Sequence, residues 1–131
     1  MKLKIKNHDN YEKGIKKLKL IGKSAEDAME KLYEISPDLV QYAIEYTCGD
    51  IYSRSGLEPK HREMIAIAAL TVSGNSLPQL KLHIEGALRS GVSIIEIKEI
   101  IIQMSVYAGW PVVFNAMLTA KEIFDQYEQT K

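Results

Sequence analysis

The sequence predicts an all-α fold of about six helices. Apolar residues recur at the three-and-four spacing of helices over most of the chain, and prolines or capping sequences stand where several of these runs begin. No convincing β-alternation or hairpin turn is present. These observations favour packed helices over any class that contains a sheet.

The composition is that of a packed globular protein. The chain has 131 residues, close to the modal size of a single domain, and 46% of them are hydrophobic. Seventeen basic residues balance 17 acidic ones, so no net field favours nucleic acid or an anionic membrane surface. The longest unbroken apolar run, 64–70, is far shorter than the roughly 20 residues needed to span a bilayer. We therefore expect neither a nucleic-acid partner nor a membrane partner.

Cysteine usage and the first residues indicate the compartment. Cys48 is the only cysteine, so no intrachain disulfide can form and a reducing compartment is expected. Lysines interrupt the start of the chain, where a secretory signal would need an apolar run. We expect a cytoplasmic protein. Residues 1–23 form a lysine-rich N-terminal segment with expected breaks at Gly14 and Gly22, and residues 24–131 form the predicted helical domain.

Prolines divide this domain into successive helices. The first is expected from Ser24 to Ser36, because a residue before proline avoids the helical region. Pro37 opens the second helix, which is expected to end near Gly49. A last amphipathic helix follows the break at 109–111.

Two of the predicted helices are apolar around most of their circumference. One opens at Pro59 and is apolar at nearly every residue from Met64 to Val72, and the other follows a capping box at 93–96. A domain of this length buries only about two-thirds of its unfolded surface, so a monomer can hardly enclose both helices. We predict a closed homo-oligomer in which neighbouring chains cover them.

The strongest candidate site pairs Glu63 with His83, whose helix is expected to start at a second capping box, 76–79. Glu63 shares a helix face with Ile67, and His83 shares one with Leu80 and Ala87 at the three-and-four spacing of a helix, so both ionisable groups are expected to point inward. A buried carboxylate costs several kcal/mol unless it is paired, which makes each group a partner for the other. The pair could move a proton, with histidine as general acid or base. A packed core histidine with a solvent-reaching glutamate is the purely structural alternative.

Several blocks together resemble the carboxymuconolactone decarboxylase family. The most specific is a His-x-x-x-Ala-Leu-x-x-Gly block that begins at His83 and is followed by Tyr-Ala-Gly-Trp-Pro at 107–111. Shorter blocks at 59–63, 96–99 and 115–116 add to the likeness, which covers roughly residues 30–125.

The resemblance implies an alkylhydroperoxidase D-like all-α fold, assembled as a trimer or as a hexamer of three dimers. In the alkylhydroperoxidase branch of this family, a Cys-x-x-Cys pair opens the helix that carries the histidine, where the helix N-terminus lowers the thiol pKa. The corresponding positions in this chain are Ser76 and Gln79, so that dithiol chemistry is not expected. The decarboxylase branch needs no cysteines.

For this branch the resemblance implies decarboxylation of a carboxymuconolactone-like lactone acid, a small-molecule substrate, with no metal and no organic cofactor. His83 would donate the proton, and Glu63 would orient it or act as an alternate acid. Six further side chains are assigned to substrate binding. Arg62 and Arg89 could clamp substrate carboxylates, and Tyr107 and Trp110 could form walls of the pocket. Ser76 and Gln79 occupy the two positions where the other branch has cysteine.

Two other functions stay open at this point. An antioxidant oxidoreductase could act on peroxides through Cys48, with a second thiol from another subunit. A non-catalytic helical oligomer could bind a small ligand or a partner in an inherited pocket, because a fold can outlast its chemistry.

Overall fold

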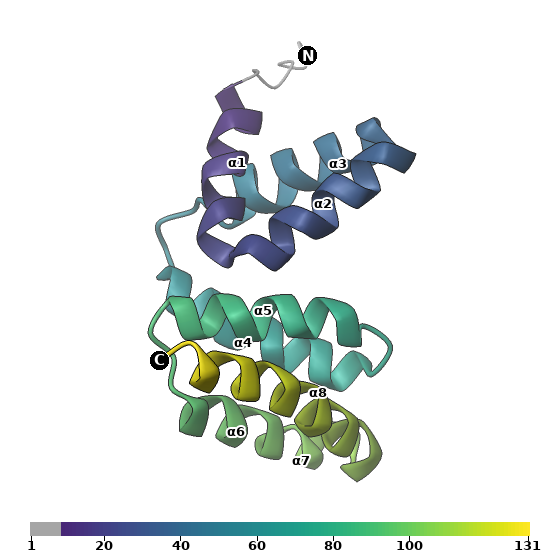
Figure 1. Cartoon of the computed structure of the whole chain (residues 1–131), viewed down its shortest axis with the longest axis vertical. Helices are drawn as coiled ribbons and strands as arrows, with labels where there is room; N and C mark the ends of the chain where they lie inside the picture. Colours follow the sequence, from purple (N-terminus) through teal and green to yellow (C-terminus); the bar gives the residue numbers. More distant parts are fainter. Residues whose placement is uncertain (1–8) are drawn as a thin grey trace. The chain divides into compact units, whose positions relative to one another are not determined.

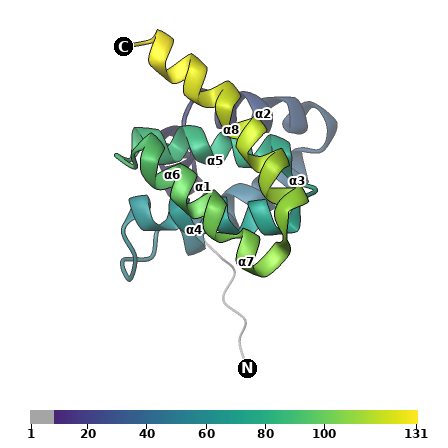
Figure 2. The ribbon, with the colours of Figure 1, turned by 90° about the horizontal axis from the view of Figure 1, so that it is seen from below.

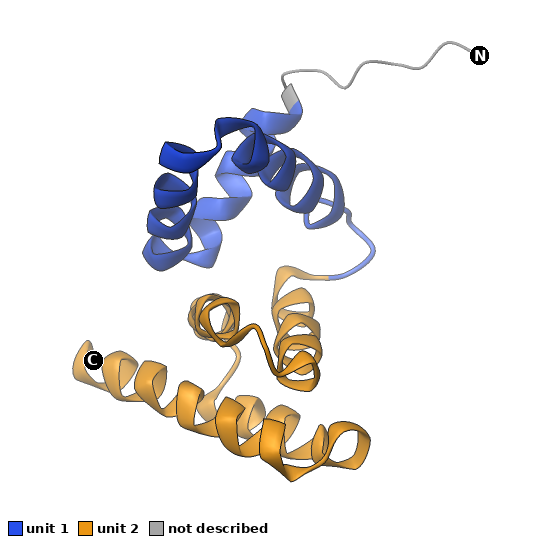
Figure 3. Ribbon diagram, turned by 90° about the vertical axis from the view of Figure 1, so that its right-hand side faces the viewer, with its two compact units in different colours: residues 1–57 blue, residues 58–131 orange. Residues whose placement is uncertain are grey.

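The computed structural model describes residues 9–131, and these residues are helical over most of their length (Figure 1). The chain divides into two compact units, with the boundary between Leu57 and Glu58 (Figure 3). No β-strand occurs within 9–131, so the predicted all-α class is confirmed. Over the same range, no helix is long and apolar enough to cross a membrane.

The first unit contains the two predicted helices and differs from the prediction in two ways, by an additional first helix and by a π-helical segment. It contains α1 (Asp9–Ile21), α2 (Lys23–Ile35), α3 (Pro37–Ala43) and a π-helix, η1 (Ile44–Ile51). The predicted break at Ser36 is confirmed, and the Ser36 hydroxyl accepts a hydrogen bond from the amide of Leu39. The helix that begins at Pro37 changes to π geometry at Ile44, which the apolar pattern did not predict. Cys48 is buried within η1.

Helix α1 occupies much of the lysine-rich N-terminal segment, whose Lys2, Lys4 and Lys6 lie outside the described residues. The expected break at Gly14 is wrong, because Gly14 lies inside α1, where α1 packs against η1. A Cβ atom at Gly14 would lie only 2.5 Å from the carbonyl oxygen of Ile44. Glycine therefore permits the close approach of two helices there. The expected break at Gly22 is confirmed, since its φ of 141° separates α1 from α2.

Replacing Gly14 by alanine is expected to destabilise the first unit. In an exposed helix this change would stabilise by about 1 kcal/mol. Here the new methyl group must displace the backbone of Ile44, and overpacking of this kind costs about 1–3 kcal/mol. Urea unfolding followed by circular dichroism measures the difference. Gly56→Ala is the control, because no atom lies within 4 Å of a Cβ at that position. A Gly14→Ala variant more stable than wild type would contradict the close approach.

The second unit has one continuous core. It contains α4 (Pro59–Ser73), α5 (Leu77–Arg89), α6 (Ile94–Gln103), α7 (Ser105–Ala108) and α8 (Trp110–Gln129). Helix α5 packs against α4 and α8, and α4 also contacts α6. Ile67 of α4, Ile84 of α5 and Ile101 of α6 are fully buried in this core. The predicted helix start at Pro59 and the break at Gly109 are confirmed.

The two helices expected to be apolar on all sides are not enclosed within this chain. Each buries one face, with Ile67 on α4 and Ile97 on α6 fully buried. Other apolar side chains of the same helices are exposed: Ile65, Val72, Ile95 and Ile102. This exposed surface is what self-association would cover, and the homo-oligomer stays a prediction.

Of the two predicted capping boxes, the one that starts α6 is confirmed. The Ser93 hydroxyl accepts from the Glu96 amide at 3.1 Å, and the Glu96 carboxylate accepts from the Ser93 amide at 2.8 Å. The box predicted at 76–79 is wrong, because the Ser76 side chain makes no capping bond. Its hydroxyl instead hydrogen-bonds to Oδ1 of Asn75 at 3.1 Å. The Ser76 hydroxyl thus donates to the side chain of its neighbour and accepts no hydrogen bond from a helix amide.

Candidate active site

Glu63 and His83 meet where α4 and α5 pack together. Nδ1 of His83 lies 2.8 Å from Oε2 of Glu63, which is hydrogen-bonding distance. The two residues come from different helices of the same unit, so the contact is set by tertiary packing and not by local sequence. The contact expected from their inward positions is therefore present.

The two partners differ in their access to solvent. The Glu63 side chain is 5% exposed, whereas the His83 side chain is 20% exposed. A carboxylate this deeply buried needs a polar partner, and the imidazole provides one. The imidazole in turn reaches solvent at its edge, so a dissolved molecule can approach it. This combination of a buried acceptor and a reachable imidazole suits proton transfer to a bound molecule.

Regular helix geometry explains why these side chains point inward. Glu63, Ile67 and Thr71 follow one another at intervals of four residues, and all three are buried on one face of α4. The buried Thr71 hydroxyl donates to the carbonyl oxygen of Ile67 at 2.7 Å, so it needs no partner from another helix. On α5, His83 precedes the fully buried Ile84 and Ala87. The apolar core thus holds both helices in the register that aligns the pair.

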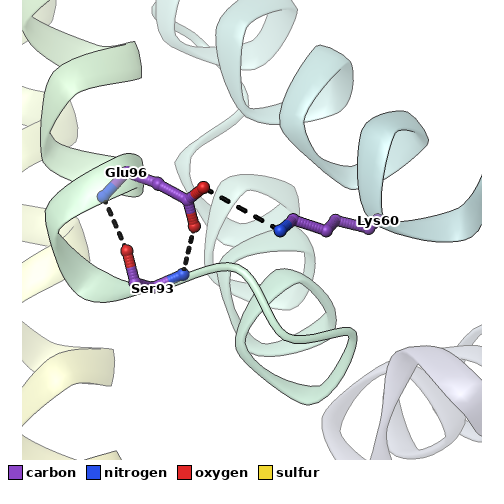
Figure 4. A network of polar contacts seen from close by, with 3 residues as sticks. All are labelled: Lys60, Ser93 and Glu96. Atoms are coloured by element: carbon purple, nitrogen blue, oxygen red, sulfur yellow. Dashed lines mark hydrogen bonds and ion pairs between the residues drawn. The ribbon is translucent and has the colours of Figure 1, made fainter.

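A second set of polar contacts lies one turn before Glu63 on α4 (Figure 4). Nζ of Lys60 lies 3.8 Å from Oε1 of Glu96, whose other carboxylate oxygen caps the start of α6. Both charged side chains are more than one-third exposed, so solvent screens their attraction and the pair contributes little to stability. Its effect is geometric, because it joins the beginning of α4 to the beginning of α6. The sequence analysis did not connect Lys60 to this box.

The capping box gives the stability a defined pH dependence. The hydrogen bond from the Ser93 amide holds the pKa of Glu96 below its ordinary value, with a further contribution from the Ser93 side chain. A lowered folded-state pKa means that the stabilisation is present above the ordinary glutamate pKa and is lost as pH falls through the folded value. We expect Glu96→Gln to be less stable than wild type near neutral pH. The difference between their urea midpoints should shrink below about pH 4. A difference that grows on acidification would contradict this assignment.

The other residues assigned to substrate binding lie in different surroundings. Arg62 is half-buried and directly precedes Glu63, while Arg89 is exposed at the last residue of α5. Gln79 is exposed one turn before His83 on α5, and Ser76 lies at the start of that helix. The structure thus brings Glu63 and His83 into contact and places Arg89 and Gln79 on exposed surface.

The two aromatic residues expected to wall a pocket are also exposed. Tyr107 belongs to α7, and Trp110 begins α8. The Trp110 ring stacks on Phe114, with ring centroids 5.9 Å apart. The sequence analysis did not single out Phe114, although its spacing of four residues from Trp110 is a signal for such a contact. Within residues 9–131, no group of three or more His, Cys, Asp or Glu side chains is arranged to hold a metal ion.

Comparison with known proteins identifies the family. Residues 37–122 match the carboxymuconolactone decarboxylase family. The chain belongs to this family. It is 29% identical over 120 residues to a 4-carboxymuconolactone decarboxylase of Acinetobacter baylyi, an alignment that covers 90% of this chain and 89% of the relative.

Two further relatives have similar levels of sequence identity to this chain. One, from Paracoccus denitrificans, is an uncharacterized 15.0 kDa protein from the nqo9-nqo10 intergenic region, 34% identical over 103 residues that cover 78% of this chain and 75% of the relative. The other is a nitrosuccinic acid decarboxylase of Metarhizium robertsii, 29% identical over 122 residues that cover 91% of this chain and 85% of the relative. The match to the carboxymuconolactone decarboxylase family includes both Glu63 and His83.

Proposed function

We propose that this protein is a carboxy-lyase that releases CO₂ from a small organic acid and protonates the resulting carbanion at carbon. The hydrogen bond between Glu63 and His83 is the observation that carries the proposal, because it orients an imidazole beside solvent-accessible space. Two similar proteins that are named decarboxylases support the reaction class. The reaction needs no oxidant or reductant.

The proposed reaction has two steps, loss of CO₂ and protonation of the carbanion. The bond between the carboxylate carbon and its neighbour breaks, CO₂ leaves, and the electron pair passes into an electron-withdrawing group of the substrate. His83 then donates a proton to the resulting carbanion, and solvent returns a proton to the imidazole. Overall, one substrate carboxylate and one proton become CO₂ and a new C–H bond.

The contact between Nδ1 of His83 and Glu63 indicates which ring nitrogen delivers the proton. Glu63 accepts the Nδ1–H hydrogen bond both before and after the transfer, so the ring keeps its orientation throughout. The transferred proton is therefore the one on Nε2, the opposite ring nitrogen. Glu63 serves as a positioning residue that fixes the tautomer and the orientation of the ring.

The two named substrates of relatives share one electronic feature. A nitro group in nitrosuccinic acid and a conjugated carbonyl in a carboxymuconolactone can each hold the electron pair that decarboxylation releases. We propose that the substrate of this protein is likewise an acid whose carbanion, after loss of CO₂, is conjugated with such a group, with a carboxymuconolactone-like lactone acid as the first choice. Arg62 is the preferred clamp for a substrate carboxylate, because it is half-buried and adjacent to Glu63. Arg89 at the exposed end of α5 is the second choice.

Turnover in D₂O tests this proposal. The purified full chain is supplied with 4-carboxymuconolactone or, separately, nitrosuccinic acid, and CO₂ release and loss of substrate absorbance are followed. The expected result is CO₂ release above the buffer rate with one deuterium at the carbon that takes up the proton, which in a conjugated lactone is the carbon next to the ring carbonyl. Incorporation at a single face of that carbon would show that a positioned protein group delivers the deuteron. Release of CO₂ from both acids at the buffer rate would overturn the proposal.

A further inference from the structure

The Glu63–His83 pair contains one proton carrier that a bound molecule can reach. The Glu63 side chain is 5% exposed, whereas the His83 side chain is 20% exposed. The 2.8 Å contact between Oε2 of Glu63 and Nδ1 of His83 keeps a proton on Nδ1, so Nε2 is the ring nitrogen that exchanges a proton with a bound molecule. Within this pair, proton removal and proton delivery therefore both belong to one atom.

The two protonation states of Nε2 have opposite chemistry. With a proton on Nε2 the ring is a general acid, which is its role in CO₂ release, and without that proton the ring is a general base. The surrounding core holds the ring in the same place in both states. Helix α5 packs against both α4 and α8 (Figure 2), and Leu80, one turn before His83, and Ile84, directly after it, are fully buried.

The proposed decarboxylation involves two carbons of the lactone ring. In a carboxymuconolactone, CO₂ leaves the ring carbon that is bonded to the ring oxygen, and the proton arrives at the carbon next to the carbonyl. One ring carbon lies between these two positions, so an imidazole that reaches one of them lies near the other. A lactone with hydrogen in place of the leaving carboxylate forms the same conjugated carbanion when it loses that hydrogen as a proton. Removal of this proton requires a base at the site and no further group.

We propose that this site also isomerises unsaturated lactones that carry hydrogen where the decarboxylation substrate carries its carboxylate. The inference rests on the proposed function, because it uses the same imidazole. The C–H bond at the carbon bonded to the ring oxygen breaks, its proton passes to Nε2 of His83, and the electron pair is delocalised into the lactone carbonyl. Nε2 then returns a proton to the carbon next to the carbonyl. The double bond moves by one position, no atom is gained or lost, and no oxidant or reductant is needed.

Muconolactone tests this inference, because it is 4-carboxymuconolactone with hydrogen in place of the ring carboxylate. The purified full chain is mixed with muconolactone, and proton NMR follows the ring hydrogens over time. The expected product is the isomer whose double bond is next to the ring oxygen. It should form about 10²- to 10⁴-fold faster than in buffer, the usual contribution of a positioned acid or base. CO₂ release from 4-carboxymuconolactone and from nitrosuccinic acid is measured on the same preparation.

Variants assign the isomerisation to the imidazole. His83→Asn and His83→Gln should both lower the isomerisation rate to that in buffer, because neither side chain can take up and return a proton. His61→Asn is the matched control, since this histidine is exposed on α4 close to Glu63 in the sequence, and it should keep the wild-type rate. Circular dichroism checks that each variant keeps its helices.

The two reactions can fail separately. Isomerisation at the buffer rate in a protein that releases CO₂ would overturn this inference and leave the proposed function standing. Isomerisation at the wild-type rate in a folded His83 variant would also overturn it. Isomerisation that depends on His83, without CO₂ release from either acid, would overturn the proposed function alone. Failure of both reactions would overturn both.

Discussion

Replacing His83 by asparagine is expected to lower kcat for CO₂ release by about 10²- to 10⁴-fold, the usual contribution of a positioned general acid. Asparagine can still direct an N–H group at Oε2 of Glu63, so the buried carboxylate keeps a donor. It has no second ring nitrogen, however, and so it cannot deliver a proton to a carbanion. The loss should therefore fall on turnover more than on KM, measured as initial rates of CO₂ release over a range of substrate concentrations.

His61 provides a matched control for this experiment. It lies on α4 close to Glu63 in the sequence, but its side chain is exposed. His61→Asn should therefore keep the kcat of wild type. Glu63→Gln should reduce kcat less than His83→Asn does, because the imidazole remains present while its orienting charge is lost. Wild-type kcat in His83→Asn would rule out this imidazole as the proton donor.

Truncation of Ile67 to alanine is expected to destabilise the second unit by about 2–5 kcal/mol, the range for large-to-small changes at fully buried aliphatic positions. Ile67 is 0% exposed and lies one turn from Glu63 on the buried face of α4. Its loss leaves a cavity in the core that aligns α4 with α5. Trp110 is the only tryptophan and belongs to this unit, so its fluorescence during urea unfolding reports on the unit directly.

Ile65→Ala is the control for the size of this effect. It removes the same atoms from the same helix, but Ile65 is 55% exposed, so less apolar contact is lost. We expect its cost to stay below about 1 kcal/mol, in the range of substitutions away from the core. Equal losses of unfolding free energy in the two variants would mean that another molecule covers Ile65 under the conditions of the measurement. A molar mass above that of one chain would identify this case.

Features that depend on short-range spacing were predicted well from the sequence. Proline at the first helical turn located the starts of α3 and α4, since a proline there removes no helical hydrogen bond. The inward position of Glu63 followed from its spacing to Ile67, and that of His83 from its spacing to Leu80 and Ala87. The family was identified from the blocks around His83, and the match over residues 37–122 confirms it.

Features that depend on contacts between distant residues were not predictable. Gly14 has the local character of a helix breaker, and only the approach of Ile44 from η1 explains its place inside α1. The π geometry of η1 likewise has no periodic pattern of apolar residues in the sequence that would indicate it. Spacing also cannot show whether an apolar side chain is covered by its own chain. Tyr107 and Trp110 lie exposed, and their assignment to a pocket wall stays a prediction.

Both members of the Glu63–His83 pair belong to α4 and α5, two helices joined by the short turn after Gly74, whose φ of 71° ends α4. The spacing between carboxylate and imidazole is thus encoded by one helical hairpin and its immediate core. No residue of 9–57 takes part in this hydrogen bond. We expect the reaction class to be inherited with this hairpin while the first unit diverges among relatives.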